Sequence, residues 1–163
     1  MKPRSPAPSR RARSASRLAA VQALYQMEVT GAPMPKVRQE FEQHRLGAPV
    51  DEEGGAEYHE ADLDLFRAIL AGVIANQSRI DRLTDAALVE RWPLGRIDAT
   101  LRALFRAGGF ELAERPDIPP KVVIGEYVDV AKAFFAEGKE AKFVNGVLDH
   151  MARAARPGAL DPR

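Results

Sequence analysis

Cysteine is absent from the 163 residues, and so is any long apolar run. Without cysteine the chain has no disulfide framework, no thiolate nucleophile and no thiolate metal site. No stretch approaches the ~20 consecutive apolar residues of a membrane span, and no basic start followed by an apolar segment marks a secretory signal. These absences predict a cytoplasmic protein. The composition, 45% hydrophobic and 29% charged, predicts one globular domain with a real core.

The motifs of common enzyme classes are also missing. There is no GxxxxGK[ST] phosphate loop, no GxGxxG dinucleotide turn and no GxSxG nucleophile elbow. The three histidines are scattered over separate segments, and a metal site at His59 with Glu60 and Asp62 fits less well than a polar loop that meets a helix start. Asp81 and Asp85 are better explained as a solvated helix face than as a carboxylate pair. We therefore expect no catalysis, no cofactor and no metal.

Acidic residues are missing from the first 17 positions, which carry six cations: Lys2, Arg4, Arg10, Arg11, Arg13 and Arg17. The rest of the chain contains 18 basic residues and all 23 acidic residues. Such an arm favours a polyanion, because Lys and Arg release counterions from phosphates; a solvated tail that binds nothing explains it equally well. An organellar transit peptide fits less well, because Arg17 continues into an amphipathic segment. The low apolar content predicts disorder over residues 1–13.

Apolar residues recur with a helical period along most of the remaining chain. The clearest stripe consists of Ile97, Leu101, Leu104, Phe105, Gly108 and Leu112. All twelve prolines lie in tails, loops or helix starts, and no strand-like alternation is present. We predict an all-α fold of about seven helices in a single compact domain over residues 14–156, with separate helices around 66–74 and 80–88. A polar loop over 45–57 and a flexible tail over 157–163 complete the organisation.

Two pairs of poor helix formers interrupt these stripes. Gly108-Gly109 should cost about 1 kcal/mol each relative to Ala, so we expect a neighbouring helix to approach closely there. Asn145 and Gly146 are expected to permit close packing of another backbone in the same way. Phe143 lies at the edge of the apolar face of the helix predicted for this segment. Pattern alone favours a core-edge aromatic, and the alternative is an exposed platform for stacking RNA bases beside Lys142.

The segment Lys142–Asp149, with the sequence KFVNGVLD, resembles the C-terminal hallmark of the NusB family of bacterial transcription antitermination factors. Two further segments resemble the same family. The sequence AVQALY at Ala20–Tyr25, after an arginine-rich start, is similar to its first helix, and PKVVI at Pro120–Ile124 is similar to its penultimate helix. The resemblance runs in order from about residue 10 to 156. It departs at the 45–57 loop, which is longer than usual, and at residues 136–141.

This resemblance implies a helical domain built from two helical subdomains. It implies binding to single-stranded boxA RNA of ribosomal RNA leader transcripts together with a small-subunit ribosomal protein, NusE, within the RNA polymerase antitermination complex. Carried over by motif, the implied RNA-binding residues are Arg10, Arg11, Arg13, Arg17, Lys142 and Phe143. Asp98 matches an acidic position near the ribosomal-protein interface. With the resemblance added, we expect Phe143 to be the exposed stacking platform.

The expected function is therefore a non-catalytic RNA-binding adapter. One alternative is an RNA-binding module related to that of a ribosomal RNA cytosine methyltransferase, because the same domain occurs fused to such an enzyme. A chain that ends at Arg163, with no cysteine and no cofactor-binding α/β half, argues against catalysis. Another alternative is a structural domain that self-associates through apolar helix faces. Monomer and homodimer are both compatible with the sequence.

Overall fold

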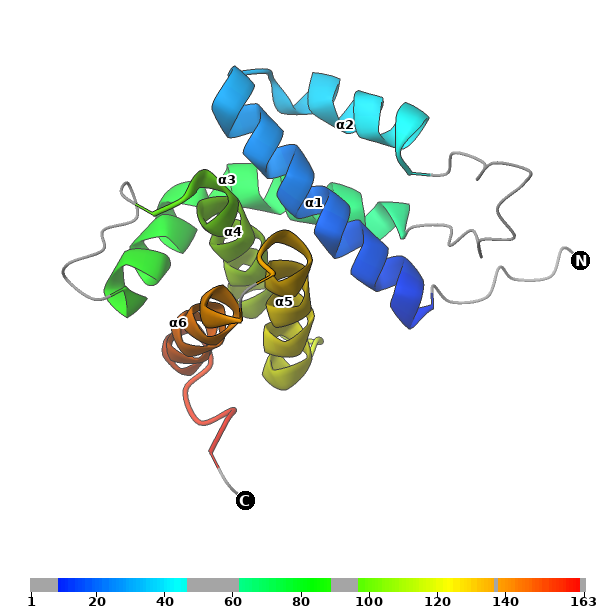
Figure 1. The fold of residues 1–163 in the computed structure, drawn as a ribbon. Helices are drawn as coiled ribbons and strands as arrows, with labels where there is room; N and C mark the ends of the chain where they lie inside the picture. The colour runs from blue at the N-terminus through cyan, green and yellow to red at the C-terminus, as the bar shows by residue number, and fades with distance from the viewer. Residues whose placement is uncertain (1–8, 47–61, 89–96, 137, 162–163) are drawn as a thin grey trace, which may run out of the picture.

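The computed structural model describes residues 9–46, 62–88, 97–136 and 138–161. Within these ranges the chain forms helices and no strand, which confirms the all-α prediction. The six helices are α1 (Arg10–Thr30), α2 (Met34–His44), α3 (Leu63–Ala87), α4 (Ala99–Glu114), α5 (Pro120–Phe134) and α6 (Lys139–Ala155). Helices α1, α2 and the start of α3 lie together, and α4, α5 and α6 form the other part of the molecule (Figure 1). None of the described helices is both long and apolar enough to cross a membrane.

Helix α1 begins earlier than the sequence pattern indicated. The Ser9 side chain accepts a hydrogen bond from the Ala12 backbone N–H at 3.0 Å, and Ser9 has extended backbone angles. A serine in this position satisfies one of the amides that a helix start leaves without a partner. The prediction of disorder up to residue 13 is therefore wrong for Arg10–Arg13, which form the first turn of α1. Residues 1–8, and residues 47–57 of the predicted loop, lie outside the described part of the chain.

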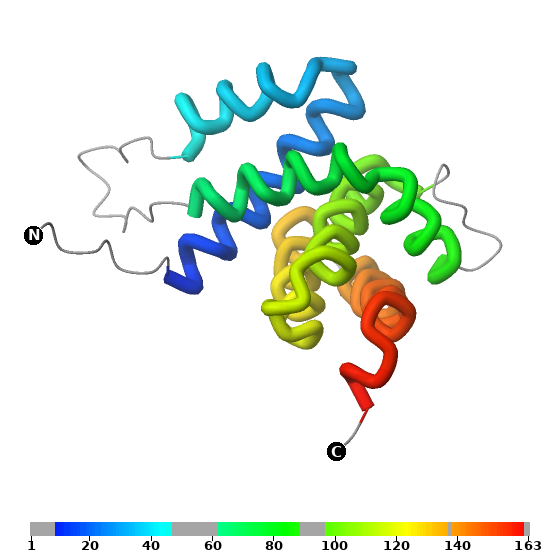
Figure 2. The backbone as a smooth tube through the Cα atoms, turned by 180° about the vertical axis from the view of Figure 1, so that it is seen from behind, coloured from blue at the N-terminus to red at the C-terminus, as the bar shows by residue number. Residues whose placement is uncertain are grey.

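Helix α3 joins the two segments that were predicted as separate helices. Asn76 has φ −123° and ψ 17°, outside the helical region, and its Nδ2 donates to the Gly72 carbonyl at 2.9 Å. The side-chain amide thus takes the carbonyl that the Asn76 backbone N–H would bind in a regular helix. The helix bends at this point and then continues (Figure 2). This continuity brings the predicted count of about seven down to six described helices.

The two glycines of α4 permit the close approach that was expected. A Cβ on Gly108 would lie 3.1 Å from Leu148 Cδ2. A Cβ on Gly109 would lie 2.7 Å from Ile80 Cγ2 and 2.9 Å from Met151 Cε. The separations at Gly109 are too short for a real Cβ and the one at Gly108 is tighter than most Cβ contacts, so the glycines let α3 and α6 pack directly on the α4 backbone. Helix α4 therefore occupies the centre of the fold.

The parallel expectation for α6 is wrong. Asn145 and Gly146 are both exposed, and a Cβ on Gly146 would meet no atom within 4 Å in the described part of the chain. No backbone packs against them within the described chain. The buried face of α6 is instead formed by larger side chains, among them Val144, Leu148 and Met151.

Arg156, at the end of α6, joins this helix to the end of α4. Its guanidinium donates to four backbone carbonyls, those of Leu112 at 2.8 Å, Ile118 at 2.5 Å, Glu111 at 2.9 Å and Arg115 at 2.7 Å. The last carbonyls of a helix have no intrahelical partner, so the Arg156 side chain supplies donors that α4 lacks. Burial lowers the pKa of this guanidinium. The chain continues in turns to residue 161, and Leu160 of the predicted tail packs against the core.

Candidate functional site

Arg17 is buried in the core, with 2% of its surface exposed. Its Nε and Nη2 donate to the two carboxylate oxygens of Glu111 on α4, each at 2.9 Å. Burial tends to lower the pKa of Arg17, but the hydrogen bond and the charge of Glu111 raise it overall, so the guanidinium stays protonated. The predicted RNA contact of Arg17 is therefore wrong, because its guanidinium is enclosed and already paired.

Glu126 on α5 connects this buried pair to the surface. Ser14 Oγ donates to Glu126 Oε2 at 2.7 Å, and Arg17 Nη1 lies 3.7 Å from the same oxygen. Arg10 Nε lies 3.6 Å from Glu126 Oε1. The three partners on α1 follow helical spacing, so they share one face of that helix. Glu126 thus holds the first two turns of α1 against α5.

The other predicted arginines of the arm lie at the molecular surface. The Arg10 side chain is 83% exposed, Arg11 is exposed and Arg13 is half-buried. A groove of about 670 Å³ runs between this part of α1 and the outer face of α5. Four cations that are not fully buried line it: Arg10, Arg13, Lys121 and Lys132. The structure therefore extends the predicted basic arm into a basic groove with a second wall.

Phe143 lies at the border of the core and only part of it is exposed. Its ring packs edge to face on Phe105, with ring centroids 5.9 Å apart and an interplanar angle of 74°. The prediction of an exposed stacking platform is therefore wrong, since Phe143 is partly buried, and the core-edge position that pattern alone favoured is confirmed. Lys142, beside it, is exposed. Helix α5 lies between α6, which carries this pair, and α1, which carries the arginines (Figure 1).

Asp98 caps the start of α4. Its carboxylate accepts a hydrogen bond from the Thr100 backbone N–H at 2.7 Å, and the residue is exposed. A carboxylate is favourable at this end of a helix, where the partial charge is positive. This position fits the sequence-based placement of Asp98 before the apolar run of α4, and it sets a negative charge two residues from the rim of a surface hollow that includes Thr100.

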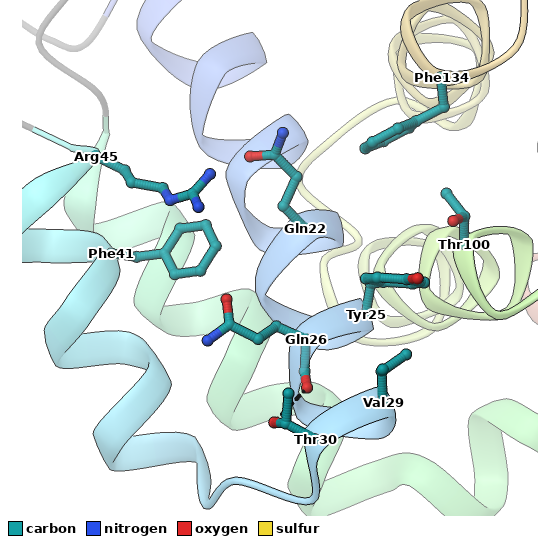
Figure 3. A pocket seen from close by; sticks show the side chains of 9 residues that line it. All are labelled: Gln22, Tyr25, Gln26, Val29, Thr30, Phe41, Arg45, Thr100 and Phe134. Atoms are coloured by element: carbon teal, nitrogen blue, oxygen red, sulfur yellow. Dashed lines mark hydrogen bonds between the residues drawn. The ribbon is translucent and has the colours of Figure 1, made fainter.

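That hollow has a volume of about 430 Å³ and exposes large apolar side chains. Tyr25 is 41% exposed, Val29 59% and Phe134 36%. In Figure 3, Tyr25 points toward Thr100, with Phe134 and Val29 on either side. On the other side of the hollow the Arg45 guanidinium lies 5.0 Å from the centre of the Phe41 ring. A group of exposed apolar side chains with polar neighbours is typical of a protein-binding surface.

The model of the NusB family matches residues 14–153. The chain belongs to the NusB family. The transcription antitermination protein NusB of Agrobacterium fabrum is 53% identical over 144 residues, which cover 88% of this chain and 85% of that relative. A solved structure of NusB from T. maritima, at 31% identity, superposes with a TM-score of 0.69 and covers 93% of this chain and 96% of the other.

A crystal structure of the antitermination factors NusB and NusE in complex with dsRNA has the same fold. A chain of that complex superposes with a TM-score of 0.72 at 22% identity, covering 90% of this NusB-family chain and 99% of the other. At this identity the comparison establishes the fold.

Sequence reasoning missed several residues of these surfaces. Lys121 and Lys132 share one face of α5 at helical spacing, and this spacing next to an arginine-rich helix was the available signal. Tyr25 is the last residue of the AVQALY segment that resembles the first helix of the family, and its exposed side chain lines the hollow. Val29 is one turn further along the same face of α1. The periodicity of α1 alone could not separate these positions from its buried ones.

In the described part of this NusB-family chain, no group of three or more His, Asp or Glu side chains is placed to hold a metal ion. Asp62, which was considered above as a metal ligand, instead caps α3. Its Oδ1 accepts a hydrogen bond from the Leu65 backbone N–H at 3.0 Å. His59 and Glu60 lie outside the described residues. Asp81, the other acid considered above, accepts two hydrogen bonds from Arg106, each at 3.0 Å.

Proposed function

We propose that this NusB-family chain is a non-catalytic RNA-binding adapter. It binds single-stranded boxA-type RNA of ribosomal RNA leader transcripts together with the small-subunit ribosomal protein NusE, and it thereby supports antitermination by RNA polymerase in the cytoplasm. One observation carries the proposal: the fold presents two surfaces of different chemistry. The first is the basic groove between α1 and α5, and the second is the apolar hollow beside Asp98.

The basic groove fits a nucleic-acid backbone. Arg10 and Arg13 on α1 and Lys121 and Lys132 on α5 place positive charge on both walls. Cations at a surface attract phosphates and release their counterions, which gives affinity without reading sequence. Sequence preference then needs contacts to bases. The accessible part of the Phe143 ring, next to Lys142, supplies a surface on which a base can stack.

The apolar hollow fits a protein partner better than RNA. Tyr25, Val29 and Phe134 present apolar surface without a flanking row of cations, and aromatic side chains are enriched in protein interfaces. Asp98 adds a negative charge near the hollow, which complements a basic ribosomal protein and steers its approach. The fold neighbour solved with NusE and dsRNA supports a partner of this kind.

The test is binding of a boxA-like single-stranded RNA to the full chain, with and without NusE. If three or four of Arg10, Arg11, Arg13 and Lys142 touch phosphates, these contacts alone should contribute about −2 to −3 to the slope of log K against log salt, since each contact contributes ~0.7 for single strands. Replacing Arg10 and Arg13 with Gln should flatten the slope. Lys36→Gln, on the exposed face of α2, is the matched control and should leave it unchanged. A slope near zero for the wild-type chain would contradict the proposal.

The alternative that the hollow itself supports is self-association, in which a second copy of the chain buries the exposed apolar side chains. Sedimentation of the free protein and of its mixture with NusE separates the two. The adapter function predicts a one-to-one complex with NusE that hides Tyr25. A stable homodimer that NusE does not disrupt, and that buries Tyr25, would favour the structural alternative.

A further inference from the structure

The outer face of α5 is the ridge between two grooves. Lys121, Gly125 and Val128 line the groove toward α1, and the same three residues line a second groove of about 310 Å³ toward α6. The second groove is completed on the α6 side by Asn145, Asp149 and Arg153. The two grooves therefore meet across α5, and the residue without a side chain, Gly125, is the lowest point of the ridge between them.

Gly125 has no packing role within the described chain. It is exposed, and a Cβ at this position would meet no atom within 4 Å. Glycine is among the least favourable residues for a helix interior. Gly109, in contrast, is required because Ile80 and Met151 occupy the space of its Cβ. Because Gly125 has no side chain and lies where the two grooves meet, an external backbone can approach the helix closely at that point.

The charges around this low point suit a polyanion. Lys121 and Lys132 are exposed at the two ends of the ridge, and neither forms an ion pair with another described residue. Arg10 and Arg13 line the far wall of the first groove. Two acids line the first groove. Glu126 accepts a hydrogen bond from Ser14 and lies against Arg17, so its charge is already compensated. Asp129 is exposed one turn after Gly125 and leaves the two lysines and the two arginines in excess.

The second groove leads toward the other predicted RNA residues. Asn145 is exposed on α6, one turn from Lys142, which is also exposed. Asp149 is occupied by Arg153, whose Nε lies 2.9 Å from Asp149 Oδ2. The amide of Asn145 can donate to a phosphate or a base edge and accept from one. The ridge at Gly125 thus lies between the arginines of α1 and the Lys142 region of α6.

We propose that single-stranded RNA crosses α5 at Gly125. Lys121 and Lys132 contact phosphates on the ridge, and the missing side chain of Gly125 lets the sugar–phosphate backbone lie against the helix. The crossing connects the first turn of α1 with the first turn of α6 in one path. This inference rests on the proposed RNA-binding function and adds a site that neither the arginine arm nor the Lys142 region contains.

The test compares Gly125→Ala and Gly125→Leu in the full chain, with the boxA-like RNA and NusE as ligands. Both substitutions improve helix propensity, so the melting temperature should stay equal or rise. RNA binding should nevertheless weaken, and for Leu by roughly tenfold, which corresponds to ~1.4 kcal/mol. Ser78→Ala on α3, which lines neither groove, also improves helix propensity and is the matched control; it should leave RNA binding unchanged.

A charge test is independent of the glycine. Replacing Lys121 and Lys132 together with Gln should reduce the salt slope of RNA binding by about 1.4, since each lost phosphate contact removes ~0.7. Wild-type affinity in Gly125→Leu would overturn the crossing, and the proposed function would stand if the Arg10 and Arg13 variants still lost affinity. Failure of the wild-type chain to bind RNA would overturn both. Loss of NusE binding without loss of RNA binding would show a protein contact and overturn the crossing.

Discussion

Tyr127 on α5 donates its phenolic hydrogen to Glu111 on α4, and both side chains are fully buried. Arg17 from α1 pairs with the same carboxylate. Three helices therefore meet at one buried negative charge. A buried charge is tolerated only when its partners are well placed, so this cluster fixes how α1 lies on α4 and α5. It also fixes the side of the molecule on which the surface arginines of α1 emerge.

Removing Arg17 should destabilise the fold rather than weaken RNA binding directly. We expect Arg17→Met to lower the free energy of unfolding by about 3–5 kcal/mol, because Glu111 is left buried without its cation. Urea unfolding measures the loss. The double variant Arg17→Met with Glu111→Gln removes both charges and should recover part of it. A double variant no more stable than the single one would show that the pairing is not the source of the effect.

Stability should fall at alkaline pH because of Tyr127. Burial, and then the charge of Glu111, raise the pKa of Tyr127 well above its usual value. In the unfolded chain the phenol ionises near pH ~10, while in the folded chain it keeps its proton. The contribution is intact below about pH 10 and is lost as the pH rises above it. Unfolding curves across this range should show a shallower fall for Tyr127→Phe than for the wild type; equal slopes would contradict the assignment.

Phe143 should contribute to both stability and RNA binding. Because its ring is half-buried on Phe105, we expect Phe143→Ala to lower the free energy of unfolding by about 1–3 kcal/mol. Removing a fully buried Phe lowers it by ~3–5 kcal/mol. Phe143→Leu keeps most of the packing and removes the aromatic face. It should unfold close to the wild type while RNA binding weakens. Parallel urea titrations and RNA titrations decide this, and normal RNA affinity in Phe143→Leu would remove the ring from the RNA surface.

Asp98 allows its role as a helix cap to be separated from its charge. Asp98→Asn keeps an oxygen that can accept from the Thr100 N–H and removes the negative charge. We expect this variant to keep its stability and to associate more slowly with NusE at low salt. Asp98→Ala should also lose about 1 kcal/mol of stability through the lost cap. Unchanged association rates for Asp98→Asn in stopped-flow mixing would place the charge outside the interface.

The same substitution should have opposite effects at two glycines. Gly146→Ala meets open space and improves helix propensity, so it should raise the free energy of unfolding by up to about 1 kcal/mol. Gly109→Ala should lower it, because the new Cβ would lie 2.7 Å from Ile80 Cγ2 and 2.9 Å from Met151 Cε. Thermal unfolding of the two variants measures both signs, and a stabilised Gly109→Ala would show that α3 and α6 yield easily.

The periodicity of the sequence was sufficient to predict the all-α class of the fold. It also predicted that a neighbouring helix approaches closely at Gly108 and Gly109. It could not predict the bend at Asn76, because a side-chain amide that binds the Gly72 carbonyl leaves the apolar stripe unchanged. Nor could it show that Arg17 is buried. An arginine beside other arginines looks like part of a cationic arm until its partner, 94 residues further along the chain, is placed in space.

The surfaces were predictable in part for a related reason. Arg10, Arg11 and Lys142 are exposed as the charge pattern suggested. The family resemblance predicts an exposed Phe143, whereas its position at the edge of an apolar stripe predicts the partly buried site that the structure shows. Lys121 and Gly125 each line both grooves beside α5, a position that depends on how α1, α5 and α6 pack. A groove forms between two or more elements, so the apolar periodicity of a single helix cannot predict it.

Arg156 closes a non-covalent ring within the chain. Its four acceptors lie between 38 and 45 residues earlier in the sequence, so the guanidinium encloses all of α5 and α6 in a loop fastened at one point. Closing such a loop costs entropy, and the contacts inside it then close shorter loops at a smaller further cost. The end of α4 and the end of α6 should therefore open together, as a single unit of hydrogen exchange, although the chain between them is long.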